Sequence, residues 1–111
     1  MRLARHMRIH IMAVAAEDRY WRSIWLHFGP MFGRLLKREL SLEAAIRRQG
    51  EGAPGLYIIP YNPERWRTMA EWLACWRELQ APAPVIVVGD VPERRQKLLK
   101  VWGVATTVQL D

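Results

Sequence analysis

The chain has 111 residues, of which 50% are hydrophobic and 25% charged, and its formal net charge is +6. This length and apolar content suit a single domain, residues 1–111, with its own core. No apolar stretch approaches the roughly 18 residues of a membrane-spanning helix, so we expect no membrane span. The positive charge favours an acidic partner such as nucleic acid, anionic lipid or an acidic protein surface, although a solvated basic surface is the commoner reason for it.

The single cysteine, Cys75, cannot form an internal disulfide and fits a reducing, cytoplasmic environment. Because it lies in a helical apolar stripe, we expect a packed and unreactive thiol. Residues 1–6 are basic and are interpreted as an N-terminal arm. The apolar run after them is short, contains His10 and leads into charged residues 17–19, which favours a strand over 8–14 rather than a signal peptide.

The clearest strand signal is the run at residues 83–90, which is apolar, rich in β-branched residues and flanked by turn formers. Such a run is typical of a strand buried on both faces of a parallel sheet. Pro60 can end a strand but would disrupt its interior. The strands predicted with most support span residues 8–14, 56–59, 84–88 and 104–110.

Residues 31–40 are ambiguous. Phe32, Leu35, Leu36 and Leu40 have helical spacing, yet the place of the segment in the chain favours a strand. We predict an edge strand at about 33–38, which charged residues 37–39 would protect from pairing with other chains.

Four helices are predicted from apolar periodicity and terminal residues. Gly29-Pro30 is expected to stop the first helix, Ser41 to cap the second, and Pro63 to occupy the first turn of the third. The predicted helices span residues 17–28, 42–49, 63–80 and 93–102. The expected inward-facing residues are Tyr20, Trp21, Ile24, Trp25 and Phe28 in the first, Trp66, Met69, Trp72, Leu73, Trp76 and Leu79 in the third, and Leu98, Leu99 and Trp102 in the last.

Strands and helices therefore alternate from one end of the chain to the other, which predicts an α/β, doubly wound, three-layer sandwich with a five-stranded parallel sheet. This layout resembles the receiver domain of response regulators, a flavodoxin-like fold with strand order 2-1-3-4-5. Local sequence is also similar, at 8–14 before a helix, at 41–46, at 84–88 and at 103–105. The resemblance implies this strand order and covers about residues 7–111.

The resemblance also implies where the phosphorylation pocket would lie. Receivers place two magnesium-binding acids after strand one, an acceptor aspartate at the end of strand three, a threonine or serine after strand four, and an aromatic residue and a lysine in strand five. The corresponding positions here hold Ala15 and Ala16, Pro60, Gly89, Val108 and Asp111.

Every one of these positions departs from the family. Proline has no carboxylate to accept a phosphoryl group, and alanine has no oxygen ligand for magnesium. A register slip could bring Glu17, Asp18 or Asp90 nearby but could not restore the acceptor, since Tyr61 and Asn62 are not carboxylates. The sequence therefore predicts a degenerate pseudo-receiver that is not an enzyme, uses no cofactor and acts in phosphorylation-independent signalling through protein–protein contact.

Receivers end with a fifth helix beside the first, and this sequence ends where that helix would begin. We therefore expect an exposed apolar face around Tyr20, Ile24 and Trp25, with Trp102 as a further interface candidate. A protein partner or a homodimer would cover that face; a shortened chain would show the same feature.

Other functions remain open. Arg94, Arg95, Lys97 and Lys100 are candidates for anion binding, so the alternative function is a basic nucleic-acid-binding module. Trp66, Trp72 and Trp76 could stack on bases, although their helical spacing favours core packing, with Trp66 and Trp102 the more exposed. A weaker third hypothesis is a small-molecule or enzymatic site at Gly89-Asp90, with an unspecific likeness of residues 84–104 to the C-terminal domain of pyruvate kinase. His6, His10 and His27 have no carboxylate or cysteine at ligand spacing, so we predict no metal site.

Overall fold

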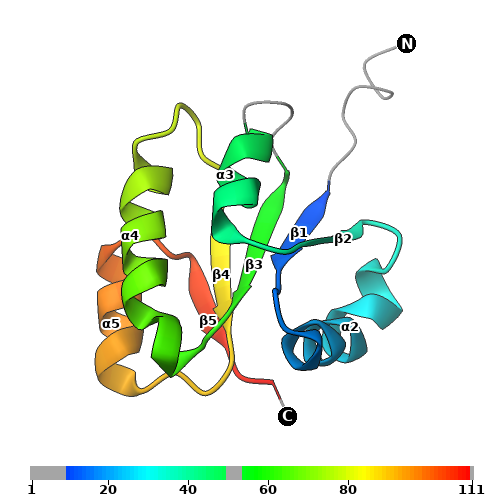
Figure 1. The fold of residues 1–111 in the computed structure, drawn as a ribbon. Coiled ribbons are helices and arrows are strands. Elements are labelled where there is room, and N and C mark those ends of the chain that lie inside the picture. The colour runs from blue at the N-terminus through cyan, green and yellow to red at the C-terminus, as the bar shows by residue number, and fades with distance from the viewer. Residues whose placement is uncertain (1–9, 50–53, 111) are drawn as a thin grey trace.

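Five short parallel strands form one sheet in the order β2-β1-β3-β4-β5, as the resemblance implied (Figure 1). The structure is a computed structural model, and it describes residues 10–49 and 54–110. The expected arm at 1–6, His6, the start of the first predicted strand and Asp111 lie outside these residues. The strands are β1 (Ile11–Val14), β2 (Leu36–Glu39), β3 (Leu56–Pro60), β4 (Val85–Val88) and β5 (Thr106–Val108).

Helices cover both faces of this sheet, which gives the predicted three-layer, doubly wound α/β fold (Figure 1). Within the described residues, one face packs against α3, α4 and α5 and the other against α2. No further helix follows β5 in the described residues, and no described helix is long and apolar enough to cross a membrane. The helices are α2 (Asp18–Phe32), α3 (Leu42–Gln49), the 3-10 turn η1 (Pro63–Arg65), α4 (Trp66–Arg77) and α5 (Glu93–Val101).

The larger core lies on the face that α3, α4 and α5 cover. Alternate strand residues such as Val85 and Val87 point into it, as the period of two in a strand requires. Trp72 and Trp76 are buried there with stacked rings 6.2 Å apart. Their indole N–H groups donate to the carbonyls of Leu42 at 2.6 Å and Ala83 at 2.9 Å. The core interpretation of these two tryptophans is therefore confirmed, while Trp66 is half-buried.

The smaller core lies under α2, on the opposite face of the sheet. Ile24 is its only fully buried helical side chain. On the strands, Ile58 and Val88 are buried, whereas Ile86 and Val108 are only half-buried. A single helix thus covers the β1 side of this face well and the β4–β5 side poorly.

The first helix does not stop at Gly29-Pro30 as predicted but continues to Phe32. Pro30 removes the hydrogen bond to the carbonyl of Leu26, and Leu26 is 70% exposed, so water can replace the missing donor. The helix ends instead at Gly33, whose N–H donates to the Gly29 carbonyl at 2.8 Å. An isolated proline with an exposed preceding turn is therefore too weak a signal to place a helix end.

The segment of residues 31–40, for which helix and strand were both considered, contains some of each. Its first residues complete α2, and β2 begins at Leu36 as an edge strand paired only with β1. Lys37 is exposed on this edge, consistent with the predicted protective charges.

Other predictions about side-chain exposure and element bounds were wrong. Cys75 is exposed rather than packed, because the buried stripe of α4 passes through residues on the opposite side of the helix. Leu98 is 38% exposed, since α5 presents only Leu99 fully to the core. The long helix predicted over 63–80 opens with η1 and ends at Arg77, and β5 is shorter than expected.

Candidate functional site

The carboxyl edge of the sheet is where open α/β folds bind ligands, and it holds most of the positions that the receiver resemblance singles out. Ala15 and Ala16 follow β1. The Ala15 side chain is fully buried and its N–H donates to the Glu39 carbonyl at 2.9 Å, whereas Ala16 is exposed. A carboxylate at the first of these positions would be buried in the smaller core, so the local packing is built for a small apolar residue.

An arginine from the edge strand holds the loop after β1. The Arg38 guanidinium donates to the carbonyl of Ala15 at 2.9 Å and of Ala16 at 3.3 Å. It also pairs with the Asp18 carboxylate at 2.9 Å and lies over the Trp21 ring at 5.7 Å. In the described structure, a cation from the chain itself therefore ties down the loop that carries metal-binding acids in receivers.

Pro60 is the last residue of β3 and pairs with Val88, and Gly89 follows β4 beside Tyr61. The Tyr61 N–H donates to the Val88 carbonyl at 2.7 Å, and the Gly89 N–H donates to the Val108 carbonyl at 2.8 Å. Gly89 has φ +129°, a conformation that L-residues rarely adopt, and a Cβ there would lie 3.3 Å from Tyr61 Cβ. The absence of a hydroxyl-bearing residue at this position is thus a property of the backbone as well as of the side chain.

Among the described residues, carboxylates do not gather at this edge. Glu17 pairs with Arg19 at 3.1 Å, and Asp18 is occupied by Arg38. Asp90 is exposed and forms no ion pair with another described residue. Within residues 10–49 and 54–110 no group of three His, Cys, Asp or Glu side chains could hold a metal ion.

Two of the predicted surface residues are instead engaged with aromatic rings. Arg95 donates to the Tyr61 hydroxyl at 2.7 Å and lies 4.5 Å from the centre of the Trp66 ring. Trp102, an interface candidate, packs 5.2 Å from Trp66 on the face opposite α2. Arg95 therefore has intramolecular partners where we had expected an open anion-binding group.

The other anion-binding candidates remain on the surface of α5. Arg94, Lys97 and Lys100 are exposed, and Lys97 lies 3.9 Å from the Glu93 carboxylate. Lys97 and Lys100 also line a cavity of about 350 Å³ between α5 and β5. The four candidates are thus divided, with three at the surface and Arg95 in the aromatic stack.

The interface candidates of α2 are also divided. Ile24 is fully buried, so its assignment to an exposed face was wrong. Tyr20 is half-buried, while Trp25 is 44% exposed and lies 5.8 Å from Trp21. Trp25 lies flat against the helix backbone, because a Cβ on Gly29 would be only 3.0 Å from its ring. Exposed apolar residues continue toward the helix end with Leu26, Met31, Phe32 and Leu35.

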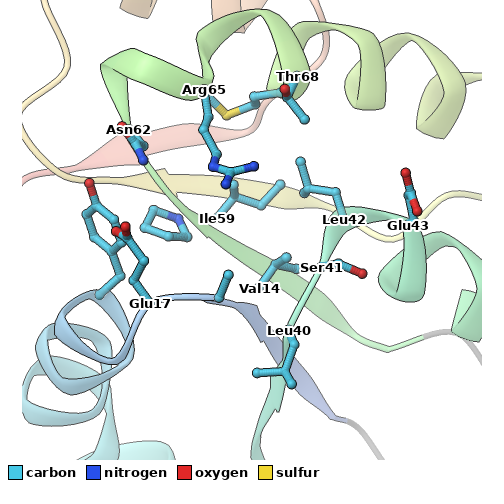
Figure 2. A pocket seen from close by; sticks show the side chains of 14 residues that line it. Val14, Glu17, Leu40, Ser41, Leu42, Glu43, Ile59, Asn62, Arg65 and Thr68 are labelled. Carbon is cyan, nitrogen blue, oxygen red and sulfur yellow. The ribbon is translucent and has the colours of Figure 1, made fainter.

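A pocket of about 260 Å³, here called the β1–β3 pocket, opens between the carboxyl ends of β1 and β3 and the starts of α3 and α4 (Figure 2). Val14 and Ile59 form its floor, Leu42 and Met69 line its walls, and Arg65 reaches over the floor. Sequence reasoning placed the weak ligand-site candidate at Gly89-Asp90 instead. The strand order could have located the pocket, since β1 and β3 flank the point where the order reverses. The turns that begin at Ser41 and Asn62 lie at the same place.

No protein-family model, no curated protein and no solved structure matches this chain. The likeness to receivers therefore depends on strand order, on spacing and on the short segments of similar local sequence.

Proposed function

We propose that this chain is a non-catalytic, receiver-like module that acts by binding a protein partner and not by phosphoryl transfer. The observation that carries the proposal is the chemistry of the carboxyl edge. Where a receiver would have its acids, acceptor and hydroxyl, the described residues are Ala15, Ala16, Pro60 and Gly89. A cytoplasmic location suits the single free thiol of Cys75.

The direct test is a phosphotransfer assay. Purified chain is incubated with magnesium and acetyl phosphate, and separately with beryllofluoride, and its mass and amide NMR spectrum are recorded. We expect no added phosphoryl mass and no shifts near Pro60 beyond those caused by salt. Saturable, magnesium-dependent labelling would contradict the proposal.

The proposed docking surface is the exposed flank of α2. Trp21, Trp25 and Phe32 recur at spacings of four and seven residues, so they share one side of the helix. Arg22 and Arg34 lie exposed on and after the same helix, and neither forms an ion pair with another described residue. Apolar surface with unpaired cations favours an acidic partner surface over a second copy of this basic chain.

Variants on the two sides of the molecule test this surface. Trp25→Glu places a charge on the α2 flank, and Val101→Glu makes a comparable change at a 75% exposed position of α5. We expect Trp25→Glu to lose a protein that the wild type and Val101→Glu both retain in crosslinked affinity capture. Light scattering of the purified chain distinguishes a homodimer from a different partner, and equal retention by both variants would contradict the use of this flank.

The alternative function, nucleic-acid binding, is not supported by base stacking on Trp72 and Trp76, because both side chains are buried. The exposed cations of α5 remain. Binding to a labelled DNA or RNA strand that weakens steeply with salt would favour this alternative over a protein partner.

A further inference from the structure

The β1–β3 pocket has the composition of a small-molecule site. Most of the surface that lines it is apolar, and polar side chains border that surface, which is the usual arrangement in ligand pockets. Its volume of about 260 Å³ suits a fragment-sized molecule. Its place at the point where the strand order reverses is the one at which open α/β sheets bind ligands.

Arg65 supplies the recognition chemistry. Its guanidinium extends from η1 over Ile59 and toward Leu42 (Figure 2), and its side chain forms no hydrogen bond or ion pair with a described residue. The turn that carries it is held in place, because the Asn62 side chain accepts a hydrogen bond from the Glu64 N–H at 3.0 Å. Arg65 is exposed, and its unpaired guanidinium lies beside apolar surface. Such a group matches a carboxylate that belongs to an apolar molecule, since its fork can bind both oxygens.

Two carboxylates limit the charge that the pocket can accept. Glu17 and Glu43 lie at opposite ends of the pocket (Figure 2), and Glu17 is already paired with Arg19. A dianion such as a phosphate monoester would be repelled by both carboxylates while being offset by Arg65 alone. The balance favours a ligand with one negative charge.

We propose that the β1–β3 pocket binds a small apolar molecule that carries a single carboxylate, with the carboxylate on Arg65 and the apolar body against Val14, Ile59 and Leu42. Thr68, exposed at the rim, provides a further hydroxyl beside the carboxylate. The proposal does not depend on the docking surface of α2, and either could fail without the other.

The test uses 3-phenylpropionate and its uncharged amide as matched probes, titrated into the full chain and followed by amide NMR shifts and calorimetry. We expect saturable shifts at Ile59, Asn62 and Thr68, with low-millimolar affinity for the acid, as befits a fragment. The amide should bind about tenfold more weakly, because it lacks the charge-assisted pair with Arg65.

Two variants of neighbouring arginines make the test specific. Arg65→Gln should lower the affinity for the acid to that for the amide and leave the affinity for the amide unchanged. Arg67→Gln, which removes an exposed cation 3.9 Å from Glu71, should leave both affinities unchanged. The proposed binding site is rejected if the acid produces no saturable shifts at Ile59, Asn62 and Thr68. The proposed role of Arg65 is rejected if both arginine variants lower the affinity for the acid equally.

A variant that fills the pocket tests whether the probes bind there or elsewhere on the basic surface. Thr68→Trp introduces a large ring at an exposed rim position, where the fold should tolerate it. We expect it to abolish binding of both probes while keeping the wild-type thermal midpoint. Undiminished binding to a folded Thr68→Trp protein would place the site elsewhere and reject the proposal.

Discussion

The Nε atom of Arg38 lies 2.9 Å from the carbonyl oxygen of Ala15, so a side chain of the edge strand β2 fixes the loop that follows β1. The Arg38 side chain is only 24% exposed, whereas that of its ion-pair partner Asp18 is 82% exposed. The contact with the Ala15 carbonyl is partly buried, whereas the contact with the Ala16 carbonyl and the ion pair are exposed. The Ala15 contact should therefore contribute more to stability than the ion pair.

Arg38→Ala should lower the free energy of unfolding by about 1–3 kcal/mol, because it leaves two loop carbonyls without their charged donor. Asp18→Asn removes only the exposed ion pair and should cost less than about 1 kcal/mol. Urea unfolding of both variants measures the difference. Equal losses would mean that the ion pair, and not the carbonyl contacts, holds the loop.

Tyr57 provides a test at high pH. Burial, with a smaller contribution from the Glu39 charge, raises its pKa from 10.0 to about 12. Its hydroxyl donates to the Ala45 carbonyl at 3.0 Å. Because the pKa is raised on folding, the resulting stabilisation is complete below pH 10 and is lost as the pH rises through 12.

Between pH 9 and pH 11 the wild type should therefore lose about 1 kcal/mol of stability that Tyr57→Phe does not lose. Urea unfolding across this range measures the difference, and Tyr57→Phe serves as the reference for every other titrating group. The ultraviolet absorbance of tyrosinate should show a tyrosine that ionises near pH 12, and this signal should be missing from Tyr57→Phe. Parallel pH profiles for the two proteins would contradict the assignment.

Gly89→Ser restores a hydroxyl at the family position but forces an L-residue to φ +129°. We expect it to lower the free energy of unfolding by about 1–3 kcal/mol and to confer no phosphoryl transfer. Gly55→Ala is a suitable control, since Gly55 is exposed and its φ is not positive. A Gly89→Ser protein as stable as the wild type would show that the backbone does not exclude the hydroxyl.

The Cys75 thiol is exposed on α4 and should react with a disulfide reagent in the folded protein at nearly the rate of a free thiol. Cys75→Ser should change stability by less than about 0.5 kcal/mol, as for other surface substitutions. Reaction that occurs only on unfolding in urea would show that the thiol is packed, as the sequence suggested.

Most helix and strand positions could be predicted because they depend on local patterns, whereas the strand order was implied by the resemblance to receivers. The β-branched run of β4 and the spacing of Trp72 and Trp76 are properties of short segments. The structure buries both tryptophans and three of the four β4 residues, with Ile86 half-buried. The Ser41 cap is equally local, and its Oγ accepts from the Ala44 N–H at 3.0 Å.

The errors arise where the result depends on what lies beyond the segment. Pro30 is tolerated because Leu26 faces water, and Cys75 is exposed because α4 turns that side outward. The β1–β3 pocket joins residues from three parts of the chain, so no local pattern marks it. No local pattern separates Arg65 from the other arginines of the chain, and its place in the lining of the pocket follows only from the structure.

Arg38 belongs to the polypeptide, so unlike a bound metal ion it cannot dissociate. The loop after β1 should therefore keep its conformation at any magnesium concentration and in the presence of chelators, with no vacant and loaded forms to interconvert.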